Sequence, residues 1–157
     1  MSQLAIVLQT GFAHSFEDFR TRIHKMADQL TDEQFWSRPY DYGNSFGNLV
    51  LHITGNLAFY IGTHIHQTGY VRDREREFEL VQGAGKSEAL RDLDAVVAMV
   101  VESLASQSDE QWSEPYVAPG IADVHNRFEM YLRCAAHFHH HIGQITYLVK
   151  EWTARAT

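Results

Sequence analysis

The chain has 157 residues, 45% of them hydrophobic and 21% charged, which is the composition of one globular domain that can bury a core. The formal net charge of −7 argues against nucleic acid and anionic membrane surfaces as partners, because both attract a basic face. No apolar run reaches the roughly 20 residues that a membrane-spanning helix needs. A single cysteine, Cys134, excludes an intramolecular disulfide, and the N-terminus lacks the basic start of a secretory signal. We therefore expect a cytoplasmic protein.

Apolar residues recur every three or four positions in four long segments, and this spacing is typical of amphipathic helices. We expect these helices at about residues 4–30, 45–65, 87–104 and 126–152. Ser87 is the expected N-cap of the third helix. The stretch from Tyr70 to Gly85 is expected to be a polar, strongly charged connection between the second and third helices. The sequence thus predicts an all-α four-helix bundle with long connections, forming one domain over residues 1–157.

The most informative segment is HFHHHIGQI, residues 137–145, in the last predicted helix. His137 and His141 are four positions apart, so a helix places them one turn apart on the same face. Two histidines at this spacing can give one metal ion two imidazole ligands. His139 projects to the opposite side and is expected to be solvated, whereas His140 flanks the line of the pair and stays a candidate.

A third candidate ligand, His52, lies in the second predicted helix, within the segment NLVLHITGNL. It stands among the apolar residues Leu49, Ile53 and Leu57, and a histidine on such a face needs a partner for its ring nitrogens. Two bundle helices that face each other would bring the three imidazoles together. Three protein ligands would leave a position for water or substrate, as in catalytic metal sites.

In NLVLHITGNL (48–57), RDREREF (72–78) and HFHHHIGQI (137–145), the chain resembles the DinB-like superfamily, and most closely a subgroup of unknown activity. That superfamily includes bacillithiol- and mycothiol-linked S-transferases built as four-helix bundles. The resemblance implies that His52, His137 and His141 bind a divalent metal, usually zinc or nickel. It also implies a bundle with crossed connectivity and a homodimer.

The resemblance implies a metal-dependent enzyme that acts on a small-molecule substrate, most concretely a transferase that uses a low-molecular-weight thiol. A metal-dependent hydrolase and a non-catalytic metal-bearing binding protein remain alternatives. A metalloprotease base is not indicated, because the chain has no HExxH motif. A di-iron carboxylate centre is disfavoured because paired Glu-x-x-His motifs are missing. Neither a catalytic residue nor a residue that binds the thiol can be assigned from the sequence.

Two further features have alternative interpretations. Cys134 lies one turn before His137 and is either a fourth ligand, a nucleophile or, as we favour, a buried structural cysteine. Arg72 and Arg74 are either a rim that receives an anionic substrate or a solvated run of charges with local ion pairs.

Overall fold

The computed structural model describes residues 1–79 and 85–155. Within these ranges the regular structure is helical, and β-pairing is limited to two isolated bridges. The elements in chain order are α1 (Gln3–Ala27), α2 (Asp32–Trp36), α3 (Phe46–Leu57), the π-helical turn η1 (Ala58–Thr63), α4 (Arg74–Glu79), α5 (Lys86–Ala105), α6 (Asp109–Trp112) and α7 (Arg127–Arg155). The predicted all-α class is confirmed. None of the helices in the described part of the chain combines the length and apolarity needed to cross a membrane.

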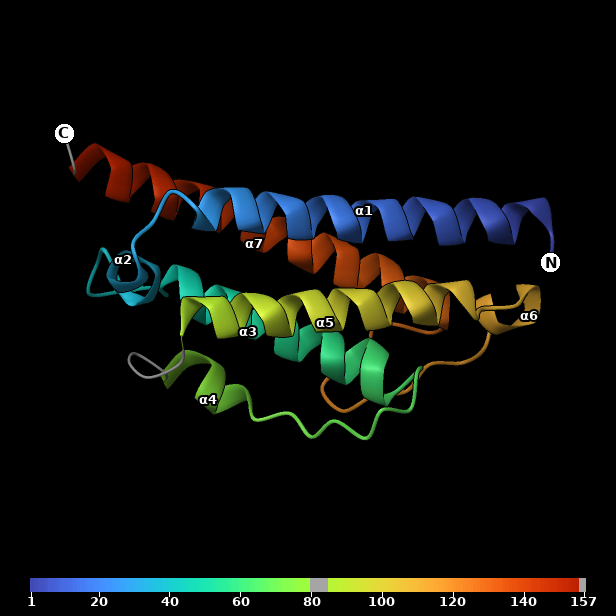
Figure 1. Ribbon diagram of the computed structural model, residues 1–157. Helices are drawn as coiled ribbons and strands as arrows, with labels where there is room; N and C mark the ends of the chain where they lie inside the picture. The colour runs from blue at the N-terminus through green and yellow to red at the C-terminus, as the bar shows by residue number, and fades with distance from the viewer. Residues whose placement is uncertain (80–84, 156–157) are drawn as a thin grey trace.

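The four long helices form a bundle in which α1 packs against α5 and α7, and α3 packs against the same two helices. Figure 1 shows that α1 and α7 run in one direction, whereas α3 and α5 run in the other. Two successive parallel helices require a connection that returns along the bundle, and residues 64–79 make this return below α3 and α5 (Figure 1). The long connections predicted from the sequence therefore produce an up-down-down-up order.

The apolar stripes of the helices meet in one core. Its largest fully buried side chains are Phe16, Ile23, Phe35, Phe46, Ile53, Leu57, Ile61, Leu93, Leu104, Met130, Tyr131 and Phe138. Most of them occupy the three- and four-residue spacings from which the helices were predicted, because that spacing places side chains on one face of a helix.

The start of α3 agrees with the prediction. The Ser45 hydroxyl accepts a hydrogen bond from the Asn48 backbone N–H at 3.0 Å, and the Asn48 side chain accepts one from the Ser45 backbone N–H. This reciprocal capping box satisfies two N–H groups that the first turn leaves without partners.

The predicted N-cap of the third helix was wrong by two positions. The N-cap of α5 is Gly85, whose extended backbone lets its carbonyl accept hydrogen bonds from Glu88 and Ala89. Ser87 therefore lies in the first turn of the helix rather than before it. The error arose because a glycine can serve as N-cap without a side-chain hydrogen bond, which leaves no polar cap in the sequence.

The predicted charged connection contains a short helix that the sequence analysis did not identify, because residues 74–79 form α4. The Asp73 carboxylate accepts a hydrogen bond from the Arg76 backbone N–H at 3.1 Å, as an N-cap side chain does. The α4 helix packs against α3, the helix that carries His52. The stretch 80–84 of the predicted connection lies outside the described residues.

Candidate metal centre

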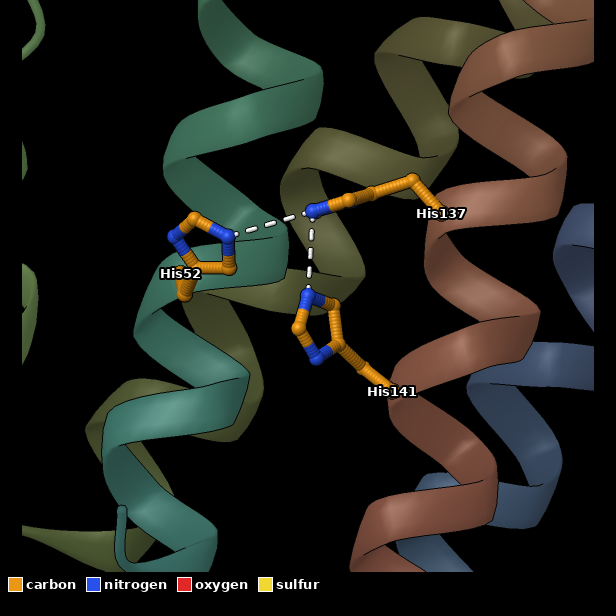
Figure 2. Close-up of side chains that lie close together, drawn as sticks. All are labelled: His52, His137 and His141. Carbon is orange, nitrogen blue, oxygen red and sulfur yellow. Dashed lines mark hydrogen bonds between the residues drawn. The ribbon is translucent and has the colours of Figure 1, made fainter. Parts of the chain in front are cut away.

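Three histidines from two facing helices meet between α3 and α7. His52 comes from α3, whereas His137 and His141 come from successive turns of α7 (Figure 2). Nε2 of His137 lies 3.1 Å from Nε2 of His52 and 3.0 Å from Nε2 of His141. One ring nitrogen from each residue lies within 4.8 Å of the other two. The structure therefore brings together the three candidate ligands that the sequence singled out.

The four histidines of the segment 137–141 lie on different sides of α7. His141 is buried and His137 half-buried, and both point toward α3 (Figure 2). His139 is exposed on another side, where its ring lies 5.4 Å from the ring of Phe19 in α1. His140 is also exposed and does not join the cluster of candidate ligand atoms among the described residues.

His52 is held by a carboxylate from α4. Its Nδ1 donates a hydrogen bond of 2.8 Å to Oε2 of Glu77. Arg72 binds the same carboxylate through both oxygens, with Nε 2.7 Å from Oε1 and Nη2 2.8 Å from Oε2. Nη2 of Arg72 also lies 3.2 Å from Nδ1 of His52, and since arginine has only donor groups, this contact would need an unprotonated Nδ1. The contact of Nδ1 with the Glu77 carboxylate is shorter, which assigns the Nδ1 proton to His52. This bond fixes the tautomer of His52 and leaves the Nε2 lone pair facing His137.

The Glu77 carboxylate is buried, and both of its oxygens accept hydrogen bonds. Its side chain is only 6% exposed, and the Arg72 side chain beside it is 8% exposed. Burial alone would raise the pKa of Glu77, but the hydrogen bonds from His52 and Arg72 outweigh it and hold the pKa below the ordinary value. Glu77 is therefore a carboxylate in the folded protein.

A glycine in α3 makes room for this carboxylate. A Cβ atom at Gly55 would lie within 2.2 Å of Oε1 of Glu77. The Asn48 side chain also donates a hydrogen bond of 3.1 Å to the Glu77 backbone carbonyl. Gly55 thus leaves space for the Glu77 side chain, and the Asn48 amide binds the Glu77 backbone. Both residues belong to the segment NLVLHITGNL.

His141 has an orienting partner of its own. Its Nδ1 lies 2.7 Å from Oε1 of Gln144, one turn further along α7, and so donates to that oxygen. His52 and His141 therefore both direct an unprotonated Nε2 toward Nε2 of His137. A neutral imidazole carries one N–H, so His137 can donate to only one of its two neighbours. A cation placed among the three nitrogens would satisfy all three lone pairs.

The spacing of these nitrogens fits a divalent ion. A tetrahedral ion with metal–nitrogen bonds of about 2.05 Å separates its ligand nitrogens by about 3.3 Å, and adjacent positions of an octahedral ion are about 2.9 Å apart. The observed separations of 3.1 and 3.0 Å from His137 lie between these values. An orienting oxygen on the second ring nitrogen is the usual support of a metal-binding histidine. The three residues thus have the donor atoms of a three-histidine site, and His52 and His141 also have this support.

The protonation states also suit metal binding. Burial, together with the neighbouring imidazoles of His141 and His52, lowers the pKa of His137 to about 3. Burial lowers the pKa of His141 as well, although its hydrogen bond to Gln144 acts in the opposite direction. Only the neutral imidazole binds a metal, and both residues are neutral near pH 7.

The other candidate residues from the sequence are Cys134, Arg72 and Arg74. Cys134 is buried with its Sγ 3.7 Å from Oδ1 of Asn56, and burial raises the pKa of its thiol to about 12. It is not part of the histidine cluster, which agrees with the structural role favoured from the sequence. Arg72 is mostly buried and its charge is paired with Glu77, whereas Arg74 is exposed.

Sequence reasoning missed Glu77 and the orienting role of Gln144. Glu77 lies in an alternating run of charges, a pattern that usually marks a solvated surface. The helix that carries Glu77 could have been predicted from Asp73, a good N-cap that is followed by helix-forming residues. Gln144 lies on the same face of the helix as His137 and His141, so its proximity to them could be expected. The sequence does not indicate that its side chain binds Nδ1 of His141.

Comparison with known proteins agrees with this architecture. The family model of the DinB superfamily matches residues 15–145. A crystal structure of a conserved protein from Enterococcus faecalis has the same fold, with a TM-score of 0.74 at 17% identity. The match covers 90% of this chain and 95% of that one. The search of curated proteins gave no match. The family match and the helical fold together show that the chain belongs to the DinB superfamily.

Proposed function

We propose that this protein is a metal-dependent S-transferase in which His52, His137 and His141 bind one divalent ion, zinc or nickel. The observation that carries this proposal is the convergence of three imidazole nitrogens, two of which are oriented by hydrogen bonds on the far side of the ring. Three protein ligands leave at least one coordination position for an exogenous group. The ion would supply Lewis acidity there, which lowers the pKa of a thiol from its ordinary value of about 8.5.

The surroundings of the site favour a thiolate over an activated water. A cleft of about 200 Å³ opens beside His52 and His137. Arg72, Arg74 and Arg133 line it, and none of its described lining residues is an aspartate or glutamate. Arg74, which has no carboxylate partner among the described residues, would stabilise an anionic nucleophile. A hydrolase commonly adds a carboxylate base to its metal site, but Glu77 is already bound to His52 and Arg72.

The roles of the protein groups in such a transfer follow from this arrangement. His52, His137 and His141 hold the ion, while Glu77 and Gln144 hold His52 and His141 in place. The thiol loses its proton to solvent, and its sulfur forms a bond to an electrophilic carbon of the second substrate. The leaving group departs with the electron pair of the bond that breaks. In this proposal the three histidines act as ligands rather than as acids or bases.

The proposal can be tested with protein purified without an affinity tag. Elemental analysis measures bound zinc and nickel, and fluorescence follows the conjugation of monochlorobimane with cysteine, glutathione, bacillithiol or mycothiol. We expect about one metal ion per chain and conjugation faster than the thiol alone, both lost in His141→Ala. Turnover of p-nitrophenyl acetate without a thiol would favour a hydrolase. Bound metal without either reaction would favour a non-catalytic binding protein.

A further inference from the structure

Two clefts meet beside the histidine cluster. The first, of about 200 Å³, is lined by His52 and His137. The second, of about 500 Å³, extends along η1 as far as Pro119. Both are lined by Tyr60, Arg72 and Arg74, so the two clefts adjoin at these side chains, and we refer to them together as the groove.

The lining of the groove has basic but no acidic side chains among the described residues, although the protein as a whole is negative. The chain has 20 acidic and 13 basic residues, yet no aspartate or glutamate is among the described residues that line either cleft. An ion bound at the histidines would add two further positive charges at one end. A low-dielectric groove of one sign attracts ligands of the opposite sign, and here that sign is negative.

Of the three arginines that line the groove, Arg74 is the one available to a ligand. Arg72 is bound to both oxygens of Glu77. Arg133 donates a hydrogen bond of 2.5 Å to the Asp123 carboxylate. Arg74 stacks on the Phe78 ring, and within the described chain no carboxylate lies within ion-pair distance of it. One available guanidinium matches one negative charge, and its planar fork pairs well with a carboxylate.

The walls of the groove beyond Arg74 are apolar and open to solvent. Phe59, Tyr70, Val71 and Pro119 line the second cleft. Val71 is 87% exposed and Tyr70 is 39% exposed, which leaves apolar surface uncovered beside a cavity. Such surface in a concave site is the feature that binds the apolar body of a small ligand.

From these observations we propose that the groove binds a substrate with one carboxylate and an apolar body. Arg74, at the junction of the two clefts, binds the carboxylate. The apolar body lies along Phe59, Tyr70 and Val71, and the reactive end of the molecule points toward His52 and His137. That the bound molecule is a substrate rests on the proposed function. Its binding to Arg74 and to the apolar wall does not, because neither requires a metal ion.

The test measures binding of 4-phenylbutanoate by isothermal titration calorimetry, with protein that has been freed of metal and with protein that has been reloaded with zinc. The uncharged 4-phenylbutanamide and the short acid acetate are the comparison ligands. We expect the phenylbutanoate to bind at least about tenfold more tightly than either, in both forms of the protein. Arg74→Gln should remove this preference in both forms, and Val71→Asp should weaken phenylbutanoate binding.

The matched control is Arg76→Gln. Arg76 is exposed and lies two residues further along α4, where it lines a neighbouring cleft with Asp73 and Asp92. That cleft shares Tyr70 and Val71 with the second cleft of the groove, but Arg76 lines neither cleft of the groove. Its loss changes the net charge of the protein by the same amount and should leave phenylbutanoate binding unchanged. Equal effects of the two arginine variants, or equal affinity for the acid and the amide, would overturn the inference.

A third outcome would also overturn it. If phenylbutanoate bound only to the zinc form and Arg74→Gln had no effect, the carboxylate would be a ligand of the ion rather than of Arg74. These results are independent of the proposed function. A protein that bound no zinc would contradict the metal site, yet the dependence of acid binding on Arg74 could still be measured.

Discussion

The Glu77 carboxylate and the His52 imidazole, 25 residues apart in the chain, are joined by a hydrogen bond of 2.8 Å in a part of the bundle that excludes most solvent. Arg72 completes the arrangement by binding both oxygens of the same carboxylate. The bond orients His52 and increases the basicity of the nitrogen that faces the other histidines. The return connection therefore contributes to the candidate metal centre, although it supplies none of the three candidate ligands.

Glu77→Gln should weaken zinc binding about 10- to 100-fold, the usual cost of losing an orienting carboxylate. It should also lower the free energy of unfolding, because the Arg72 guanidinium would remain buried without an opposite charge. Competition with a chelating dye measures the zinc affinity, and urea unfolding measures the stability. Glu79→Gln, an exposed position in the same helix, is the control and should change neither quantity. An unchanged zinc affinity in Glu77→Gln would show that the bond to His52 does not support the site.

Gly55→Ala should have a similar but purely steric effect. The added methyl group would lie within 2.2 Å of Oε1 of Glu77, so the carboxylate has to move away from His52 and Arg72. We expect weaker zinc binding and lower stability in urea, although alanine is the better helix former. Gly143→Ala is the matched control in α7, because nothing lies within 4 Å of its added Cβ. That variant should gain about 0.5–1 kcal/mol of stability. Two substitutions of the same kind should thus change stability in opposite directions.

The sequence predicts the ligand-bearing helices well because their signal is local. His137 and His141 are on one face for purely geometric reasons, and His52 falls within a strong apolar stripe. The burial of Glu77 could not be predicted in this way. It depends on His52 and the small residue Gly55, which both come from α3, and on an ion pair with Arg72, which looks in the sequence like any other pair in a charged run.

The π-helical turn η1 was missed for a related reason. Residues 58–63 carry the same apolar periodicity as the rest of the second predicted helix, so the pattern indicates one continuous α-helix. The His66 backbone N–H instead bonds to the Ile61 carbonyl five residues earlier. Such turns are set by packing around a helix and carry no local sequence signature.

The four histidines of the segment 137–141 should differ sharply in their effect on metal content. His141→Ala removes a proposed ligand and should reduce bound zinc or nickel to a small fraction of the amount in the unmodified protein. His139→Ala changes an exposed ring beside Phe19 and should leave the metal content unchanged. Elemental analysis of both variants, prepared in parallel, makes the comparison. Equal losses would contradict the assignment of ligands.

Removal of the metal should lower the melting temperature. An ion that binds only the folded state stabilises it by mass action, by about 2.7 kcal/mol when free zinc exceeds the dissociation constant 100-fold. Calorimetric scans before and after treatment with a chelator, followed by readdition of zinc, measure this effect. The His141→Ala protein should melt at the same temperature with and without zinc. A melting temperature of the unmodified protein that did not respond to zinc would contradict a specific site in the folded state.

The pH dependence of the metal-free protein should reflect the histidine cluster. Burial lowers the pKa of His137 to about 3 and lowers that of His141, whereas an unfolded chain has histidines with a pKa near 6.5. Above pH 6.5 neither state binds protons at these groups, so they add no pH dependence. Below pH 6.5 the unfolded state gains protons that the folded state cannot accept, so the free energy of unfolding falls as the pH decreases toward 3.

The lowered pKa of Glu77 has the same sign, but its effect begins only below about pH 4.5, so the window between pH 6.5 and 5 isolates the histidines. Urea unfolding midpoints in the presence of a chelator measure the slope in that window. His137→Gln should flatten the slope, because it removes a group that the folded state holds neutral. His139→Gln, which removes an exposed histidine, should leave the slope unchanged. A midpoint in the unmodified protein that stayed constant from pH 7 to 5 would show that burial does not disfavour the protonated imidazoles of this cluster.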